Sequence, residues 1–351
     1  MERETQKPDS QTPTLPDDLI FEHILPELPL KSLTRFKSVS KLWLSTISSP
    51  KFTKSQFLLF SGNHGPHPLF TSVTLDQHGG VDQILKFNYN CNGKRIHVLG
   101  SCNGLVCFCD EYFNFYICNP FTENCNDVIN RPENAPDFTP NKVISAGFGY
   151  VSSIDDYKIV CLIGKSTRYF SLALSNVYIF SLSNWKWERA LSRLNVHGIE
   201  IDPVDRVPVL VNDALYWYAS NINHIVEMNL INAEIRSFPL TTADMLNSLR
   251  PDKWVRLYWI KGRLCWRCGR EVWSLNKDDM SWMKMYDLNF TGMRLLCVSE
   301  AGKWLVLNHK FLALLDSSKS FYRQYQGGTS FDGPIFSAWD YKMTSVSPFL
   351  E

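Results

Sequence analysis

A short polar turn followed at once by an apolar run recurs through most of the chain, and this repeat limits the fold more than any other feature. The turns are Asn103-Gly104, Asp155-Asp156, Asn212-Asp213, Lys261-Gly262 and Ala301-Gly302, roughly 40 to 57 residues apart. Asn, Asp and Gly favour hairpin turns because they tolerate positive φ. A period of this length, carried by short strands, is typical of the four-stranded blades of a β-propeller.

Further strands follow these turns in step. Third strands are predicted at 115–118, 177–180, 225–228, 272–275 and 311–314, and fourth strands at 185–187 and 282–285. A sixth unit can be assembled from strands in 57–75 and a tail strand near 335–346, which would remove the open sheet edges. We therefore predict about six blades over residues 55–351, with five or seven as alternatives. A β-sandwich would need neither this period nor a pairing of the first and last strands.

Residues 14–54 have helical rather than strand periodicity. Asp17 and Asp18 suit a helix N-terminus, since a carboxylate is favoured at the positive end of the helix dipole. Pro26 and Pro29 end that helix because proline lacks an amide hydrogen. Two more short helices are predicted before residue 50, and residues 1–13 are predicted to be disordered. The fold class is therefore α+β and multidomain, with a three-helix module before an all-β propeller-like domain.

The helical module carries more large apolar residues than three short helices can hide from water. A module of fewer than about 60 residues buries too little surface to be comfortably stable alone. We therefore expect a partner protein to cover part of its apolar surface.

Charge and hydropathy exclude several classes of partner. Lys+Arg 36 against Asp+Glu 35 leaves a formal net charge of +1, so no overall field favours nucleic acid or an acidic membrane. The N-terminus has no apolar run typical of a signal peptide, and no stretch approaches the ~18 apolar residues of a spanning helix. We expect a cytoplasmic or nuclear protein. Ten cysteines in a chain this long do not suggest a secreted disulfide scaffold. Cys107, Cys109, Cys265 and Cys268 alternate in apolar runs, where free Cys acts as a small apolar side chain.

No motif predicts catalysis, a metal or a cofactor. Gly100-Ser101-Cys102-Asn103-Gly104 resembles a nucleophile elbow in letters, but a strand pattern follows it where the elbow needs a helix. A hairpin is the better interpretation. Cys265 and Cys268 lie three apart on a predicted strand and so face opposite sides, which is wrong for a shared metal. Gly147-Phe148-Gly149 lacks the rest of a phosphate-binding loop.

Candidate recognition residues lie in long connections, because loops on a rigid scaffold carry specificity. Aromatic and Arg side chains are the usual interface anchors. The predicted substrate contacts in segments 164–174 and 241–256 are Arg168, Tyr169, Phe170, Met245, Arg250 and Trp254. Segment 125–142, rich in Pro, Asn and acidic residues, is a third candidate connection.

The helical module resembles the F-box motif of plant F-box proteins. The resemblance runs from Leu15-Pro16-Asp17-Asp18-Leu19 through Leu28-Pro29 to Val39-Ser40-Lys41-Leu42-Trp43. Ser40 stands where many relatives have Cys, and we expect little effect because both are small. The remainder is similar to the F-box-associated, kelch-like region of the same family, on Asn119-Pro120-Phe121-Thr122 and Gly147-Phe148-Gly149-Tyr150 among others. The diglycine of a strict kelch repeat is mostly missing.

This resemblance implies a non-catalytic adaptor. F-box proteins dock onto a Skp-family linker, which joins them to a cullin in a ubiquitin ligase, and the β domain holds the protein to be modified. By position, the implied linker contacts are Leu15, Pro16, Leu19, Ile24, Leu28, Pro29, Leu33, Val39 and Trp43, some of which must pack internally. Two alternatives stay open: a propeller enzyme or sugar-binding protein that uses its loop face, and an F-box scaffold that acts outside a ligase.

Overall fold

The computed structural model divides the chain into two compact units, residues 1–53 and 54–351. The residues that the structure describes are 15–28, 30–47, 56–60, 69–75, 81–88, 95–120, 124–125, 128–132, 143–166, 172–190, 199–201, 207–240, 255–288, 294–299, 302–307, 311–315, 321–326 and 337–340. The predicted disorder of residues 1–13 lies outside them. None of the described helices is long and apolar enough to cross a membrane.

The first unit contains two regular helices and one mixed helical segment. The mixed segment is a single α turn at Asp17–Leu19 (α1), a π turn at Ile20–Ile24 (η1) and a 3-10 turn at Leu25–Glu27 (η2). The regular helices are α2, Leu30–Phe36, and α3, Lys41–Ile47. The prediction of three regular helices is therefore met only in part. Pro26 lies within the 3-10 turn, where its missing amide hydrogen prevents a continuous α-helical ladder.

A small apolar core holds these segments together. Leu25, Leu33 and Ile47, one from each segment, are buried in it. Trp43 packs edge-on against two phenylalanines, with ring centroids 5.8 Å from Phe21 and 5.6 Å from Phe36. Such T-shaped pairs are favourable because the positive edge of one ring meets the negative face of another.

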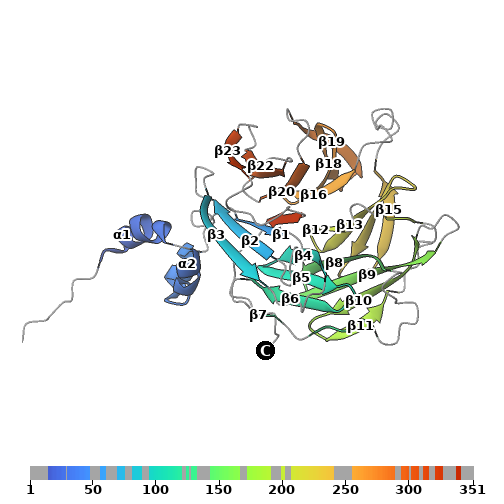
Figure 1. The fold of residues 1–351 in the computed structure, drawn as a ribbon, viewed down its shortest axis with the longest axis horizontal. Coiled ribbons are helices and arrows are strands. Elements are labelled where there is room, and N and C mark those ends of the chain that lie inside the picture. Colours follow the sequence, from blue (N-terminus) through green and yellow to red (C-terminus); the bar gives the residue numbers. More distant parts are fainter. Residues whose placement is uncertain are drawn as a thin grey trace, which may run out of the picture. The chain divides into compact units, whose positions relative to one another are not determined.

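The second unit is an all-β propeller whose described strands form six four-stranded antiparallel sheets. In Figure 1 the sheets lie around a common centre, following the sequence from blue-green to red. Five sheets consist of consecutive strands. They are β4 Ile96–Cys102, β5 Leu105–Asp110, β6 Phe115–Asn119 and β7 Asn124–Cys125; β8 Val143–Val151, β9 Asp156–Ser166, β10 Leu172–Ser181 and β11 Lys186–Arg189; β12 Val209–Val211, β13 Ala214–Ala219, β14 His224–Asn229 and β15 Ile235–Pro239; β16 Arg256–Ile260, β17 Arg263–Cys268, β18 Glu271–Asn276 and β19 Ser281–Asp287; β20 Arg294–Val298, β21 Trp304–Leu307, β22 Phe311–Leu315 and β23 Phe321–Gln326.

The remaining sheet joins the two ends of this unit. It has the order β24-β1-β2-β3, with β1 Gln56–Phe60, β2 Leu69–Leu75, β3 Val81–Asn88 and β24 Ser337–Asp340. Phe57 of β1 pairs with Asp340, and Phe60 pairs with Ser337. The predicted pairing between an early strand and the tail is confirmed. It covers the edge of β1 that a free strand would present to other chains.

Contacts between neighbouring sheets run all the way round. β24 contacts β4 and β20, β4 contacts β8, β8 contacts β13, and β16 contacts both β12 and β20. The buried side chains between successive sheets form separate apolar clusters. Each sheet is thus covered on both faces by its neighbours, which explains why runs such as Leu105–Asp110 are buried at every position.

The polar turns named from sequence are the hairpin turns of this unit. Asn103, Asp155, Asn212 and Lys261 have positive φ, as do the glycines that follow Asn103 and Lys261. Asn, Asp and Gly adopt this left-handed region at low cost, which is why they stand there. The turn predictions at Asn103, Asp155, Asn212 and Lys261 are confirmed. Ala301 of the fifth turn lies outside the described residues, and Gly302 beside it has positive φ.

One disulfide of the propeller was not predicted from the sequence. Cys118 and Cys125 lie directly opposite each other on β6 and β7 and are joined by a disulfide. Among the described free cysteines, Cys107, Cys109, Cys161 and Cys265 are buried apolar side chains, whereas Cys102 and Cys297 are partly exposed. Sequence spacing could not separate the two kinds, because only strand register brings Cys118 and Cys125 together.

Candidate functional site: an apolar face of the helical unit

Six large apolar side chains of the helical unit remain exposed to solvent. They are Leu15 at 59%, Leu19 at 44%, Ile24 at 40%, Val39 at 58%, Leu42 at 53% and Leu44 at 48%. Pro16 is exposed as well. Single exposed apolar residues are common, but six in one small helical unit are typical of an interaction surface.

Helix geometry decides which residues point inward. On α3, Trp43 and Ile47 are four apart and pack into the core, so Leu42 and Leu44 on either side of Trp43 are left at the surface. Leu33 is only 1% exposed, and Leu28 is half-buried against the same core.

The implied linker contacts therefore fall into two groups. Leu15, Pro16, Leu19, Ile24 and Val39 are available to a partner, whereas Leu28, Leu33 and Trp43 hold the unit together. Pro29 lies outside the described residues. Leu42 and Leu44 were not among the sequence candidates. The four-residue spacing of Trp43 and Ile47 was the signal that could have found them.

Ser40 fixes the start of α3. Its hydroxyl accepts a hydrogen bond from the Trp43 backbone N–H at 3.1 Å, which is an N-cap interaction. The hydroxyl therefore contributes more than small size.

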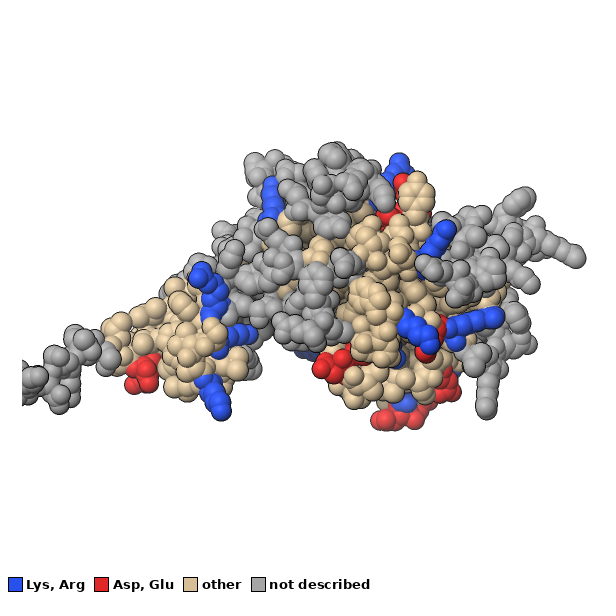
Figure 2. Space-filling view, turned by 90° about the horizontal axis from the view of Figure 1, so that it is seen from below, with Lys and Arg blue, Asp and Glu red and all other residues tan. Residues whose placement is uncertain are grey.

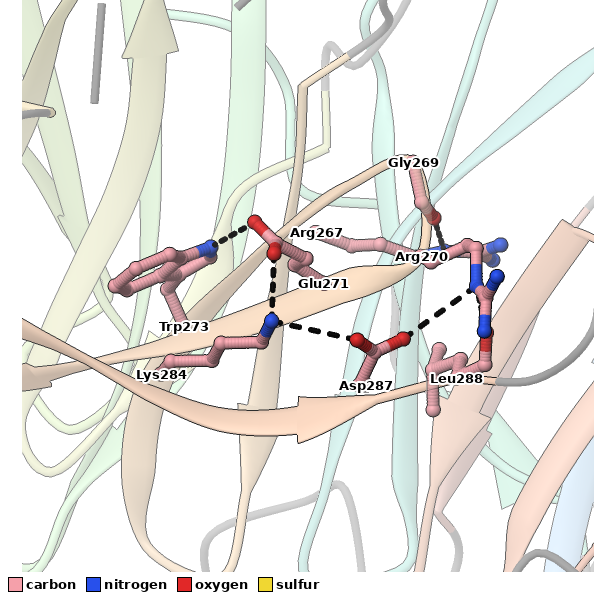
Figure 3. A network of polar contacts seen from close by, with 8 residues as sticks. All are labelled: Arg267, Gly269, Arg270, Glu271, Trp273, Lys284, Asp287 and Leu288. Carbon is pink, nitrogen blue, oxygen red and sulfur yellow. Dashed lines mark hydrogen bonds and ion pairs between the residues drawn. The ribbon is translucent and has the colours of Figure 1, made fainter. Parts of the chain in front are cut away.

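The sheet β16–β19 carries a network of charged and polar side chains (Figure 3). Lys284 Nζ lies 2.6 Å from Glu271 Oε1 and 3.3 Å from Asp287 Oδ2, and Arg270 Nε lies 3.4 Å from Asp287 Oδ1. The Trp273 indole N–H donates to Glu271 Oε2 at 3.3 Å. Hydrogen bonding to Glu271 raises the pKa of Lys284. Because the cations and carboxylates neutralise one another across β18 and β19, this network ties two strands together rather than presenting a reactive group.

The structure also decides the nature of the Gly100–Gly104 segment. Cys102 ends β4 and pairs with Leu105 of β5, so the segment is the predicted hairpin. Burial raises the pKa of the Cys102 thiol. A thiol with a raised pKa is a poor nucleophile, since the thiolate is the reactive form. Within the described ranges, no three His, Cys, Asp or Glu side chains are grouped so as to hold a metal ion.

The six predicted substrate contacts lie outside the described residues. Arg168, Tyr169 and Phe170 belong to the connection between β9 and β10, and Met245, Arg250 and Trp254 to that between β15 and β16. They remain predictions.

A helical unit with six exposed large apolar side chains, followed by a closed ring of sheets, defines a two-part protein. Comparison with known families agrees with this division. The family model described as F-box associated beta propeller domain matches residues 70–326, and the F-box domain model matches residues 13–55. The chain belongs to the family of F-box proteins with an associated β-propeller.

Related proteins come from Arabidopsis thaliana. An F-box protein is 24% identical over 94% of this chain and 81% of its own length. An F-box/kelch-repeat protein is 25% identical over 63% of this chain and 64% of its own length. A third relative is 27% identical over 75% of this chain, and this chain spans 60% of that relative's length.

The fold also resembles a solved structure. A chain of the nidogen/laminin complex is superimposed with a TM-score of 0.50 and 11% identity, covering 83% of this chain and all of the other. At this identity the likeness concerns the fold alone.

Proposed function

We propose that this chain is the substrate-recognition subunit of a Skp–cullin–F-box ubiquitin ligase, with a six-bladed propeller as its substrate-binding part. The F-box would bind a Skp-family linker and, through it, a cullin. The propeller would hold a target protein in the cytoplasm or nucleus. The observation that supports this most is the exposure of six large apolar side chains of the F-box unit: Leu15, Leu19, Ile24, Val39, Leu42 and Leu44.

The mechanism is positional. Holding a target beside the ubiquitin-carrying enzyme raises the effective concentration of its lysines, to roughly millimolar for a short tether. The chain itself would supply no reacting group. A rigid ring suits this task, because a scaffold that does not bend keeps the distance between target and linker constant.

Burial of these exposed apolar side chains would supply affinity for the linker. Each fully buried Leu or Val side chain contributes about 1.5–3 kcal/mol by the hydrophobic effect. A charge placed among these side chains would lose water without gaining a partner, which costs more than the lost contact.

The test is a calorimetric titration of the purified chain with a purified Skp-family linker, which measures the dissociation constant. We expect Val39→Asp with Leu42→Asp to weaken binding at least a hundredfold, since both residues are more than half exposed and neither is needed in the core. Met283→Asp is the matched control. Met283 is 46% exposed but lies on β19 of the other unit. Equal binding by the double variant and the control, or no binding by the unmodified chain, would overturn the proposal.

For target recognition we propose Arg168, Tyr169, Phe170, Met245, Arg250 and Trp254. The support is chemical, since Arg and aromatic side chains in long connections are the common anchors of interfaces. Alanine substitution at these six positions should weaken binding of a target and leave linker binding unchanged.

A further inference from the structure

Three turns at one end of neighbouring sheets each present a half-exposed apolar side chain. Ile154 lies in the β8–β9 turn and is 48% exposed, Trp185 lies in the β10–β11 turn at 50%, and Ile231 lies in the β14–β15 turn at 47%. In a sheet of consecutive antiparallel strands, the first and third turns lie at the same end. We call these three residues the turn patch.

Hydrogen bonds hold two of the turns to each other across the sheets. Asp213 accepts from the Ser152 backbone N–H at 3.3 Å through its carboxylate, and from the Leu230 N–H at 2.8 Å through its backbone carbonyl. Lys158 donates to the Leu230 carbonyl at 2.6 Å. The turns that carry Ile154 and Ile231 therefore both donate a hydrogen bond to Asp213.

The third turn is anchored to the same place. The Asp156 carboxylate accepts from the Ser181 hydroxyl at 2.6 Å and from the Ser183 N–H at 2.9 Å. The Leu182 N–H donates to the Tyr157 carbonyl at 2.9 Å. Asp156 and Tyr157 directly follow the turn that carries Ile154, so hydrogen bonds connect all three turns of the turn patch.

A tryptophan is unusual at the backbone conformation of residue 185. Its φ is +50°, a region in which bulky side chains are disfavoured by about 1–2 kcal/mol. Asn and Asp occupy comparable positions at 103, 155, 212 and 223. Trp185 gains one edge-on contact with Phe180, at 5.4 Å between ring centroids, yet half of it faces solvent. A residue in a disfavoured conformation that keeps an aromatic surface exposed points to use at an interface.

The charged groups on these turns are mainly carboxylates. Asp155 and Glu234 lie on two of these turns, and Asp213 lies on the adjoining β12–β13 turn. Their carboxylates accept hydrogen bonds from Tyr150, Ser152 and Asn232. Among the described residues, none of the three forms an ion pair. Nearby lysines are already engaged, since Lys158 binds the Leu230 carbonyl and Lys186 lies 3.6 Å from Glu188. Figure 2 shows acidic side chains gathered along the lower margin of the larger unit.

We infer that the turn patch binds a segment of a partner protein in which apolar side chains stand beside Lys or Arg. The apolar side chains would cover Ile154, Trp185 and Ile231, and the basic ones would meet Asp155, Asp213 and Glu234. Charge complementarity of this kind sets specificity and speeds association. The inference rests on the proposed function and adds a second contact surface for the protein that is held. This surface lies at the opposite end of the strands from the β9–β10 and β15–β16 connections.

The probe for the test is a display library of random twelve-residue peptides, selected on the immobilised full-length chain. We expect the enriched peptides to combine net positive charge with Leu, Ile or Phe. A synthetic copy of the most enriched peptide should lose at least tenfold in affinity with Trp185→Ser, and similarly with Ile154→Ser plus Ile231→Ser. Asp155→Asn with Glu234→Gln should weaken it severalfold at low salt and little at high salt.

Matched controls lie in turns at the other end of the strands. Ile222→Ser removes a side chain that is 40% exposed in the β13–β14 turn, and Glu111→Gln removes an exposed carboxylate in the β5–β6 turn. Both should leave peptide affinity unchanged. If Trp185→Ser fails to fold by circular dichroism, the isoleucine pair carries the same test.

Enrichment of acidic or wholly polar peptides, no enrichment at all, or equal losses in the controls would overturn the inference. Linker binding is measured on the same preparations. If the chain binds the linker but no basic apolar peptide, the inference about the turn patch is wrong and the ligase proposal stands. If the chain binds such peptides through the turn patch but does not bind the linker, the ligase proposal is wrong and the turn patch stands as a peptide-binding surface.

Discussion

The indole N–H of Trp217 donates a hydrogen bond to the Ser145 hydroxyl at 2.7 Å, joining two neighbouring sheets inside the ring. Both side chains are buried, at 1% and 4% exposed. Because no water replaces a lost partner there, the bond both stabilises the pair and fixes how β13 sits against β8.

Ser145→Ala should lower the free energy of unfolding by about 1–3 kcal/mol, since it leaves a buried N–H without that acceptor. Urea denaturation followed by circular dichroism measures the change. Ser153→Ala, in the exposed β8–β9 turn, is the control and should shift stability by less than about 0.5 kcal/mol. Equal stability of the two variants would show that the bond contributes nothing.

A pair of leucines separates folding from docking in the F-box unit. Leu33 is buried and Leu42 is 53% exposed, so the same truncation has different consequences. Leu33→Ala should destabilise the unit by about 2–5 kcal/mol. Leu42→Ala should hardly alter stability and should instead weaken linker binding. Hydrogen exchange of residues 15–47 in the full chain reports the first effect, and calorimetry with the linker reports the second. Faster exchange in Leu42→Ala than in Leu33→Ala would contradict the assignment.

The N-cap hydrogen bond of Ser40 predicts that the side chain at this position must accept a hydrogen bond, and that small size alone is not enough. Ser40→Ala should destabilise α3 by about 1 kcal/mol because the Trp43 N–H loses its acceptor. Ser40→Asn should restore most of that stability, since an Asn side chain can accept the same bond. Exchange rates of the α3 amides provide the measurement. Failure of Asn to rescue would argue against the cap.

The cysteines should fall into two sets by their reactivity toward iodoacetamide: buried thiols and disulfide-bonded cysteines. Burial raises the pKa of Cys265 to about 12, so at pH 8 only about one molecule in ten thousand carries the thiolate. Burial also raises the pKa values of Cys107, Cys109 and Cys161. These four should resist iodoacetamide in the native protein and react more readily as the pH rises.

Cys118 and Cys125 should react with iodoacetamide only after a dithiol reductant has opened their disulfide. Peptide mapping by mass spectrometry distinguishes the two sets. Labelling of Cys118 or Cys125 without reductant would contradict the assigned bond.

The sequence by itself determined the local elements. Asn103-Gly104 and Lys261-Gly262 predict turns because few other residues tolerate positive φ at low cost, and the apolar runs beside them predict strands. The regular spacing of these signals predicts a propeller-like domain, and Pro26 predicts the interruption of the first helical segment. All of these follow from properties of a residue and its near neighbours in the chain.

Only the tertiary structure decided which groups meet across sheets. Gly147 and Gly149 looked like a fragment of a phosphate loop, but they lie on β8, where an added Cβ would overlap Pro208 or crowd Leu210 and Leu230 of the next sheet. The same holds for the hydrogen bonds of Asp213 with Ser152 and Leu230. The Cys118–Cys125 bond lies within one sheet and depends on the pairing register of β6 and β7. Such contacts join residues whose separation along the chain carries no signal, because close packing between sheets depends on register and twist rather than on sequence order.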